Sequence, residues 1–158
     1  MCQPMLCTGF CAFSCSPDCP VATLSAGPAL TEFMAANDTV INDEDGDASD
    51  WIEIRNDGPV AVDLAGWHLT DDATLPTKWT FPTPLLDPGA HLIVFASDRD
   101  RRMTGSELHT DFRRSSAGEH LALMMPDGVT PATAFSPVYP PNLSIYPNPT
   151  ALSGRGCA

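Results

Sequence analysis

Short alternations of apolar and polar residues recur along the middle of the chain, and they predict β-strands. The segment 30–34 alternates in a way that predicts a strand with Leu30 and Met34 facing inward. In the segment 51–56, Ile52 and Ile54 share one face of a second predicted strand. The run 91–97 is apolar on both faces, which predicts a central strand of a sheet. Further strands are predicted at 60–72, 78–82, 108–112, 119–125 and 129–135.

Turn sequences separate these predicted strands. Asp57-Gly58-Pro59, Asp87-Pro88-Gly89 and Pro126-Asp127-Gly128 are the strongest. The 16 prolines and 11 glycines fall between the apolar runs instead of forming one block. Short strands separated by frequent turns are typical of a β-sandwich or barrel, and we find no convincing helical pattern. A chain of 158 residues is long enough for one such domain.

The two ends of the chain differ from this pattern and define the expected domain boundaries. Residues 1–27 contain five cysteines and several prolines, without the close pairs typical of a zinc site. We interpret this segment as a leader outside the folded domain: a degenerate or misassigned start, a cleaved export signal, or a disulfide-bonded segment. The β domain is expected at 28–142, and residues 143–158 are interpreted as a proline-rich surface tail.

The overall charge excludes some classes of partner. Eight basic residues against 20 acidic ones give a formal net charge of −12, which disfavours generic nucleic-acid binding. No segment approaches the roughly 20 consecutive apolar residues that a membrane span needs. We therefore expect neither a nucleic-acid partner nor a membrane span.

The most concentrated chemistry lies before the second strand, in an acidic segment. Asp43, Asp45 and Asp47 alternate, so an extended backbone would present them on one side. Asp50 and Glu53 could complete an oxygen-rich shell, and such a shell suits calcium. The order of residues differs from that of an EF-hand loop. The alternative is a solvated loop in which aspartates accept hydrogen bonds from their own backbone.

A second candidate surface is basic. Arginines cluster within a short span of the chain, at 99, 101, 102, 113 and 114. We expect either a solvated loop rim beside acidic neighbours or a binding surface, formed by Arg99, Arg101, Arg102, Arg113 and Arg114. The three tryptophans are expected in the core and on sheet faces, but Trp51 is out of phase with its apolar neighbours in the second strand, so it is the candidate for exposure at that surface.

Signals of catalysis are weak. The four histidines, His68, His91, His109 and His120, alternate with core positions and are expected on exposed strand faces. The sequence contains no G-x-S-x-G nucleophile elbow. We therefore expect a protein that is not an enzyme.

Several motifs together resemble the lamin tail domain family in its bacterial secreted form. They are Glu32-Phe33-Met34-Ala35, the loop 43–51, Trp51-Ile52-Glu53-Ile54 with Asn56, Leu64-Ala65-Gly66-Trp67-His68-Leu69-Thr70-Asp71, Lys78-Trp79-Thr80-Phe81-Pro82, Pro88-Gly89 with Leu92-Ile93-Val94-Phe95-Ala96-Ser97, Glu107-Leu108-His109-Thr110-Asp111-Phe112, and Gly118-Glu119 with Leu121-Ala122-Leu123. The resemblance covers residues 28–142 and implies an immunoglobulin-like β-sandwich.

The resemblance also implies a function and a partner, which would be an unknown protein or a cell-surface component. We expect a non-catalytic binding or attachment module of an exported bacterial protein, located outside the cell or on its surface, with calcium as a candidate structural ion. One alternative is an accessory-domain fragment of a larger secreted hydrolase or nuclease. Another is a structural scaffold domain that associates with itself through an exposed strand edge.

Overall fold

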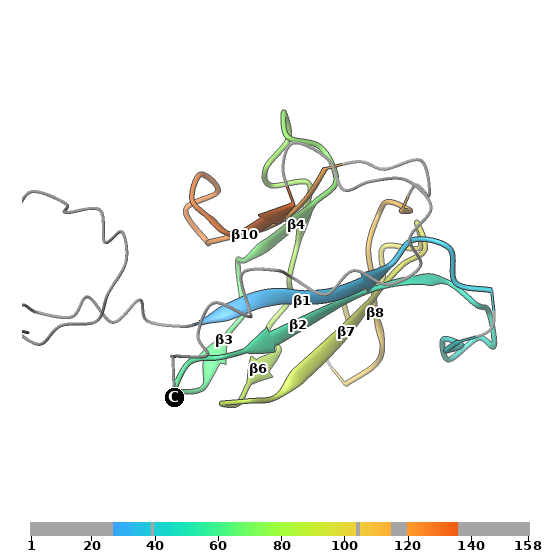
Figure 1. Ribbon diagram of the computed structural model, residues 1–158, viewed down its shortest axis with the longest axis horizontal. Helices are drawn as coiled ribbons and strands as arrows, with labels where there is room; N and C mark the ends of the chain where they lie inside the picture. Colours follow the sequence, from blue (N-terminus) through green and yellow to red (C-terminus); the bar gives the residue numbers. More distant parts are fainter. Residues whose placement is uncertain (1–26, 39, 104, 115–119, 136–158) are drawn as a thin grey trace, which may run out of the picture.

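A computed structural model describes residues 27–38, 40–103, 105–114 and 120–135, and in these residues the chain forms strands and loops without a helix (Figure 1). The first sheet has the order β1-β2-β7-β8 and the second has the order β10-β9-β4-β5. The first contains β1 (Pro28–Met34), β2 (Asp50–Asn56), β7 (His91–Ala96) and β8 (Leu108–His109). The second contains β10 (Pro131–Phe135), β9 (Leu121–Met124), β4 (His68–Thr70) and β5 (Trp79–Thr80). A separate pair joins β3 (Val62–Asp63) to β6 (Leu85–Leu86).

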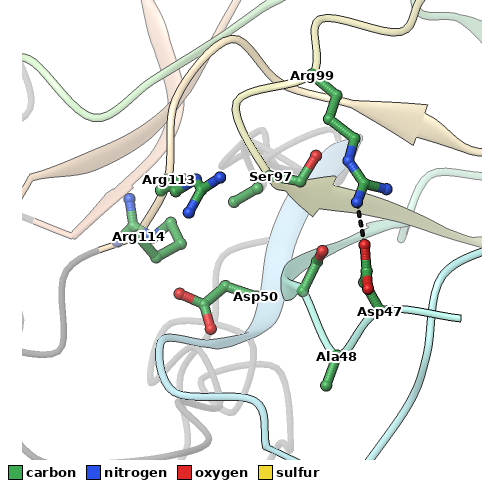
Figure 2. A pocket seen from close by; sticks show the side chains of 9 residues that line it. Asp47, Ala48, Asp50, Ser97, Arg99, Arg113 and Arg114 are labelled. Carbon is green, nitrogen blue, oxygen red and sulfur yellow. Dashed lines mark hydrogen bonds and ion pairs between the residues drawn. The ribbon is translucent and has the colours of Figure 1, made fainter. Parts of the chain in front are cut away.

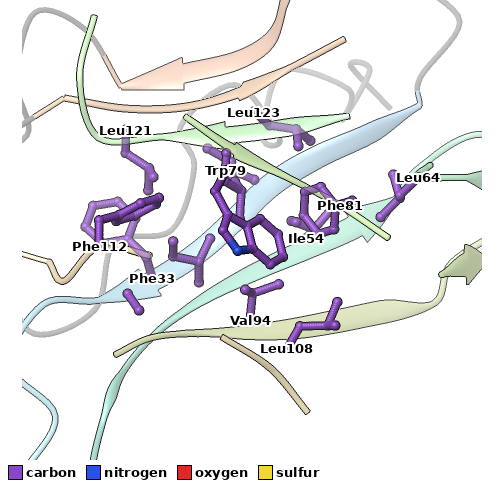
Figure 3. Close-up of a cluster of buried hydrophobic side chains, with 14 of the residues drawn as sticks. Phe33, Ile54, Leu64, Trp79, Phe81, Val94, Leu108, Phe112, Leu121 and Leu123 are labelled. Carbon is purple, nitrogen blue, oxygen red and sulfur yellow. The ribbon is translucent and has the colours of Figure 1, made fainter. Parts of the chain in front are cut away.

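The two four-stranded sheets enclose one apolar core. Alternate residues of each strand point inward, so Ile52 and Ile54 of one sheet and Leu121 and Leu123 of the other belong to the same core. Trp79 lies in the middle of this core (Figure 3). All five side chains are fully buried. Burial of such a side chain contributes about 1.5–3 kcal/mol, which makes this core the main source of stability. The predicted β-sandwich is confirmed.

The central strand was also predicted correctly. β7 lies between β2, to which it is antiparallel, and β8, to which it is parallel. Val94 faces the main core, whereas Phe95 belongs to a smaller cluster on the other face of the sheet. Both faces of this strand are therefore covered, and this is why its sequence lacks polar alternation.

An irregularity in β1 changes which of its residues face inward. The pairing of β1 with β2 shifts register between Leu30 and Glu32. The shift lets Leu30 and Phe33, three positions apart, both enter the main core, and it sends Met34 to the opposite face. The prediction that Met34 faces the main core with Leu30 was therefore wrong, because strict alternation does not hold across a bulge.

Trp51 lies on this opposite face and is buried. It packs with Met34 and Phe95 in the smaller cluster, and Ile41 from the β1–β2 connection covers it. Only 6% of its surface is exposed. The expectation that Trp51 is exposed was wrong, because the segment after β1 folds back over this face of the sheet.

Three cations lie over aromatic rings of the core. Arg102 lies 5.4 Å from the ring centre of Trp79, Lys78 lies 5.2 Å from that of Phe112, and Arg114 lies 5.1 Å from that of Phe33. Such contacts contribute about 0.5–2 kcal/mol each.

The leader and the tail expected at the two ends of the chain remain predictions. The expected leader at 1–27, apart from Gly27, and the expected tail at 143–158 lie outside the described residues. Within the described part, the structure contains no helix that is long and apolar enough to cross a membrane.

Candidate functional site

The acidic segment forms a tight loop organised around Asp43. One oxygen of this carboxylate accepts the backbone N–H groups of Asp45 at 3.1 Å and Asp47 at 3.0 Å, and the other accepts the hydroxyl of Ser49 at 2.9 Å. Gly46 closes the turn with a φ of 84°, a conformation that costs glycine little. The loop is thus held by hydrogen bonds from its own backbone to an aspartate, which was the alternative to the calcium site.

The hydrogen bonds decide the ionisation of Asp43. Burial alone would raise the pKa of this carboxyl group. The hydrogen bonds from Asp47, Ser49 and Asp45, together with the charge of Arg99, outweigh burial and lower the pKa below its ordinary value. Asp43 is therefore a buried carboxylate that stays ionised in the folded protein.

Two arginines from the segment after β7 bind this loop. The Arg99 guanidinium contacts Asp43 at 3.1 Å and also bonds to Asp45 and Asp47. Arg101 bonds to Asp45 and to Glu44, the latter at 2.9 Å. We call these six residues the arginine clasp. It joins two loops that are more than fifty positions apart in the sequence.

The clasp does not fit a calcium site. Guanidinium groups supply the positive charge around Asp43, Asp45 and Asp47, and their N–H groups use oxygens that a calcium ion would need. The described residues contain no group of three or more His, Cys, Asp or Glu side chains that could hold a metal ion.

The other two expected ligands lie apart from the clasp. Asp50 accepts the backbone N–H of Asn37 at 2.9 Å, and burial raises the pKa of Asp50. Glu53 accepts the hydroxyl of Thr31 and lies 3.1 Å from His91 Nδ1. The five carboxylates therefore do not converge, and calcium does not enter the function proposed below.

The remaining arginines have separate roles. Arg102 bonds to Asp100 at 2.6 Å and lies over the core ring described above. Arg114 is only 6% exposed and donates to the carbonyl of His120 at 3.3 Å. Arg113 is exposed and forms no ion pair with any residue in the described part of the chain. The arginines of the predicted basic rim therefore already have partners within the described part of the protein, with the exception of Arg113.

A polar pocket of about 400 Å³ lies where these segments meet (Figure 2). Asp47 and Arg99 form one side, while Asp50 lies with Arg113 and Arg114 on the other. Ala96, the last residue of β7, and the following Ser97 also line the pocket. The complete lining is Asp47, Ala48, Ser49, Asp50, Ala96, Ser97, Arg99, Arg113 and Arg114. The structure therefore brings parts of both predicted surfaces into one site.

Below this pocket lies a buried histidine that sequence reasoning placed wrongly. His109 is fully buried, its Nδ1 lies 2.8 Å from Ser97 Oγ, and its ring stacks on Phe95 at 5.3 Å. Burial, and next the charge of Arg101, lowers the pKa of His109. His91 is exposed as expected, whereas His68 and His120 are half-buried. No sequence signal marked His109, because Leu108 and His109 of the short strand β8 are both buried.

Among the residues that the structure describes, the Ser97–His109 pair lacks the third member that a hydrolytic triad requires. His109 Nε2 has no hydrogen-bond partner among the residues the structure describes. In a catalytic triad this second nitrogen binds a carboxylate that orients the ring. The pair therefore has the geometry of a structural hydrogen bond beneath the pocket.

The architecture defines the class of protein: an all-β, immunoglobulin-like sandwich with a polar pocket at one end. The model of the Lamin Tail Domain family matches residues 32–137, which is more than half of the chain. The chain therefore belongs to the lamin tail domain family, and the resemblance to that family is confirmed, while its bacterial secreted form stays a prediction. No curated protein and no solved structure matches the chain. The family consists of non-catalytic immunoglobulin-like domains that act as binding or structural modules.

Proposed function

We propose that this chain is the attachment module of an exported bacterial protein, and that it binds a protein or cell-surface partner through the polar pocket. The proposed location is outside the cell or on its surface. Family membership supports a binding or structural role. Export, the bacterial source and binding through the pocket are parts of the proposal that go beyond family membership.

The observation that carries this proposal is the position of Arg113. The nearby Arg99 and Arg101 are held by carboxylates of the clasp, so they have little capacity left for a partner. Arg113 lies exposed at the pocket, forming no ion pair within the described residues. A guanidinium offers five N–H donors in a fixed plane, and this geometry suits a carboxylate or backbone carbonyl of a partner.

The support around Arg113 is rigid. Its backbone forms a β-bridge with Ser97, directly after the end of β7. The clasp fixes the facing loop at 43–49, so both walls of the pocket are preformed. Binding to a preformed site avoids the entropy cost of ordering a loop. Loops at one end of a rigid sandwich are also where immunoglobulin-like domains carry binding sites.

The test compares two charge reversals. The labelled full chain is titrated onto intact cells of the producing bacterium, as wild type, as Arg113→Glu and as Arg55→Glu. Arg55 is the matched control, because it is also exposed, forms a surface ion pair with Asp57, and lies at the other end of β2. We expect saturable binding that Arg113→Glu weakens about tenfold or more, because a like-charge contact in an interface costs several kcal/mol. Arg55→Glu should bind as the wild type does.

Equal weakening by both variants would show a general charge effect and would contradict the pocket. Absence of saturable binding to cells would contradict attachment to the cell surface. Fractionation of the producing culture tests export: recovery of the chain in the cytoplasm alone would exclude the proposed location. A stable dimer in light scattering would favour the self-associating scaffold instead.

A further inference from the structure

A second groove lies on the outer face of the sheet β10-β9-β4-β5. Leu121 and Leu123 of β9 face the core, so the alternate residues Ala122 and Met124 point outward. Both are nevertheless buried, with exposures of 1% and 6%. They form the floor of a groove of about 280 Å³, and Val129 stands at its rim with 78% of its surface exposed.

The lining of this groove is apolar. Besides the floor residues, Pro76, Pro131 and Ala134 contribute carbon atoms to it. Two loops form the sides, one after β4 and one between β9 and β10. An apolar groove with an exposed apolar side chain at its rim is the kind of surface on which an apolar segment can dock.

The chain itself leaves the described structure beside this groove. Ala134 lines the groove, and the next residue, Phe135, is the last of β10. Residues 136–158 follow, and the part from 136 to 154 contains no charged side chain although the whole chain has a net charge of −12. Within it, Tyr139, Leu143 and the adjacent pair Ile145-Tyr146 are separated by prolines and small polar residues.

We propose that residues 138–146 of this chain dock in the groove. A linker of two residues after Phe135 keeps this segment close to the groove, so its effective concentration is in the millimolar range or above. Each residue of extended chain spans about 3.3 Å, so the segment is long enough to cross β10 and β9. Its prolines restrict the unbound chain, which lowers the entropy cost of docking.

The absence of charge in this segment distinguishes it from other occupants. The polar side chains of the groove are Thr70, whose hydroxyl is bonded to backbone carbonyls, and Asp72 and His120, while the other lining side chains are apolar, so a charged segment would lose its hydration with little gain. The segment 138–146 matches that lining with aromatic and aliphatic side chains.

The test is a photo-crosslink within the full chain. The photoreactive residue p-benzoylphenylalanine replaces Val129 at the rim, and in a control it replaces Leu85. Leu85 is also exposed, at 66%, but it lies in β6 of the separate two-stranded sheet. After irradiation of the dilute protein, mass spectrometry maps the crosslinked residues. We expect an intramolecular crosslink from position 129 into 138–146 in the monomer, and no crosslink into this segment from position 85.

Two paired variants sharpen the test. Leu143→Asp with Ile145→Asp should reduce the crosslink from position 129 about fivefold or more, because each aspartate would have to lose its hydration in the groove. Asn142→Asp with Ser144→Asp adds the same charge at the alternate positions and should change the yield less than about twofold. Crosslinks between two copies, crosslinks to other parts of the chain, or equal effects of both pairs would overturn the proposal.

Discussion

The guanidinium of Arg99 lies 3.1 Å from a carboxylate oxygen of Asp43, whose side chain is completely buried. This contact fixes the β1–β2 loop against the segment that follows β7. It also accounts for the density of carboxylates in that loop, because they surround arginines instead of a metal ion.

Removal of the Arg99 charge should destabilise the protein. In Arg99→Gln the carboxylate of Asp43 keeps its backbone hydrogen bonds but loses its cation, while Asp45 and Asp47 lose an attractive partner. Because a hydrogen bond to a charged group contributes about 1.5–3 kcal/mol, we expect a loss of about 1–3 kcal/mol in the free energy of unfolding. Urea denaturation measures it. The matched control, Arg113→Gln, should lose less than about 0.5 kcal/mol, and an equal loss there would contradict the special role of Arg99.

Calcium should leave the stability of the protein unchanged. A specific ion that binds only the folded state raises stability by about 2.7 kcal/mol at one hundred times its dissociation constant. We expect that neither millimolar calcium nor a chelator shifts the melting temperature in a thermal-shift titration. Asp45→Ala is the comparison variant. If calcium raised the melting temperature of the wild type and Asp45→Ala abolished this increase, the calcium site expected from the sequence would be supported.

Stability should fall on mild acidification, in part because of His109. Burial lowers the pKa of His109 in the folded protein, so this ring is neutral there while the unfolded chain titrates near its ordinary value of about 6.5. The unfolded state then binds more protons, and stability is lost as the pH falls from about 6.5 through the lower pKa of the folded state.

The variant His109→Asn isolates this contribution, because asparagine can still form a hydrogen bond with Ser97. We expect a smaller drop in the free energy of unfolding between pH 7.5 and 5.5 than in the wild type. The same drop is measured in His68→Asn for comparison, because burial also lowers the pKa of His68. An unchanged drop in His109→Asn would show that His109 does not contribute.

Truncation of Trp51 should damage the fold. The side chain fills the smaller cluster between Met34 and Phe95, so Trp51→Ala is expected to cost about 3–5 kcal/mol. Trp51→Phe keeps most of the volume, and the indole N–H has no hydrogen-bond partner among the described residues, so it should cost less than about 1.5 kcal/mol. Chemical denaturation distinguishes the two. A cost below about 0.5 kcal/mol for Trp51→Ala would mean that this residue is exposed after all.

The local pattern of apolar and polar residues was sufficient to predict the strands and the class of fold. Alternation placed Ile52 and Ile54 in the core, and the doubly apolar run at 91–97 identified the central strand β7. These predictions succeed because strand periodicity is a property of neighbouring residues. The motifs along 28–142 were also sufficient to indicate the family, whose model matches 32–137.

What the sequence by itself determined, then, was a lamin-tail sandwich with one acidic and one basic loop. The tertiary structure decided what those loops do. It placed Arg99 among the carboxylates that had suggested calcium, and it left Arg113 exposed at a pocket. It also covered Trp51, on which Met34, Phe95 and Ile41 pack, and His109, which lies against Phe95 and Ser97. Contacts between residues more than fifty positions apart depend on how the chain folds back, and no local periodicity contains that information.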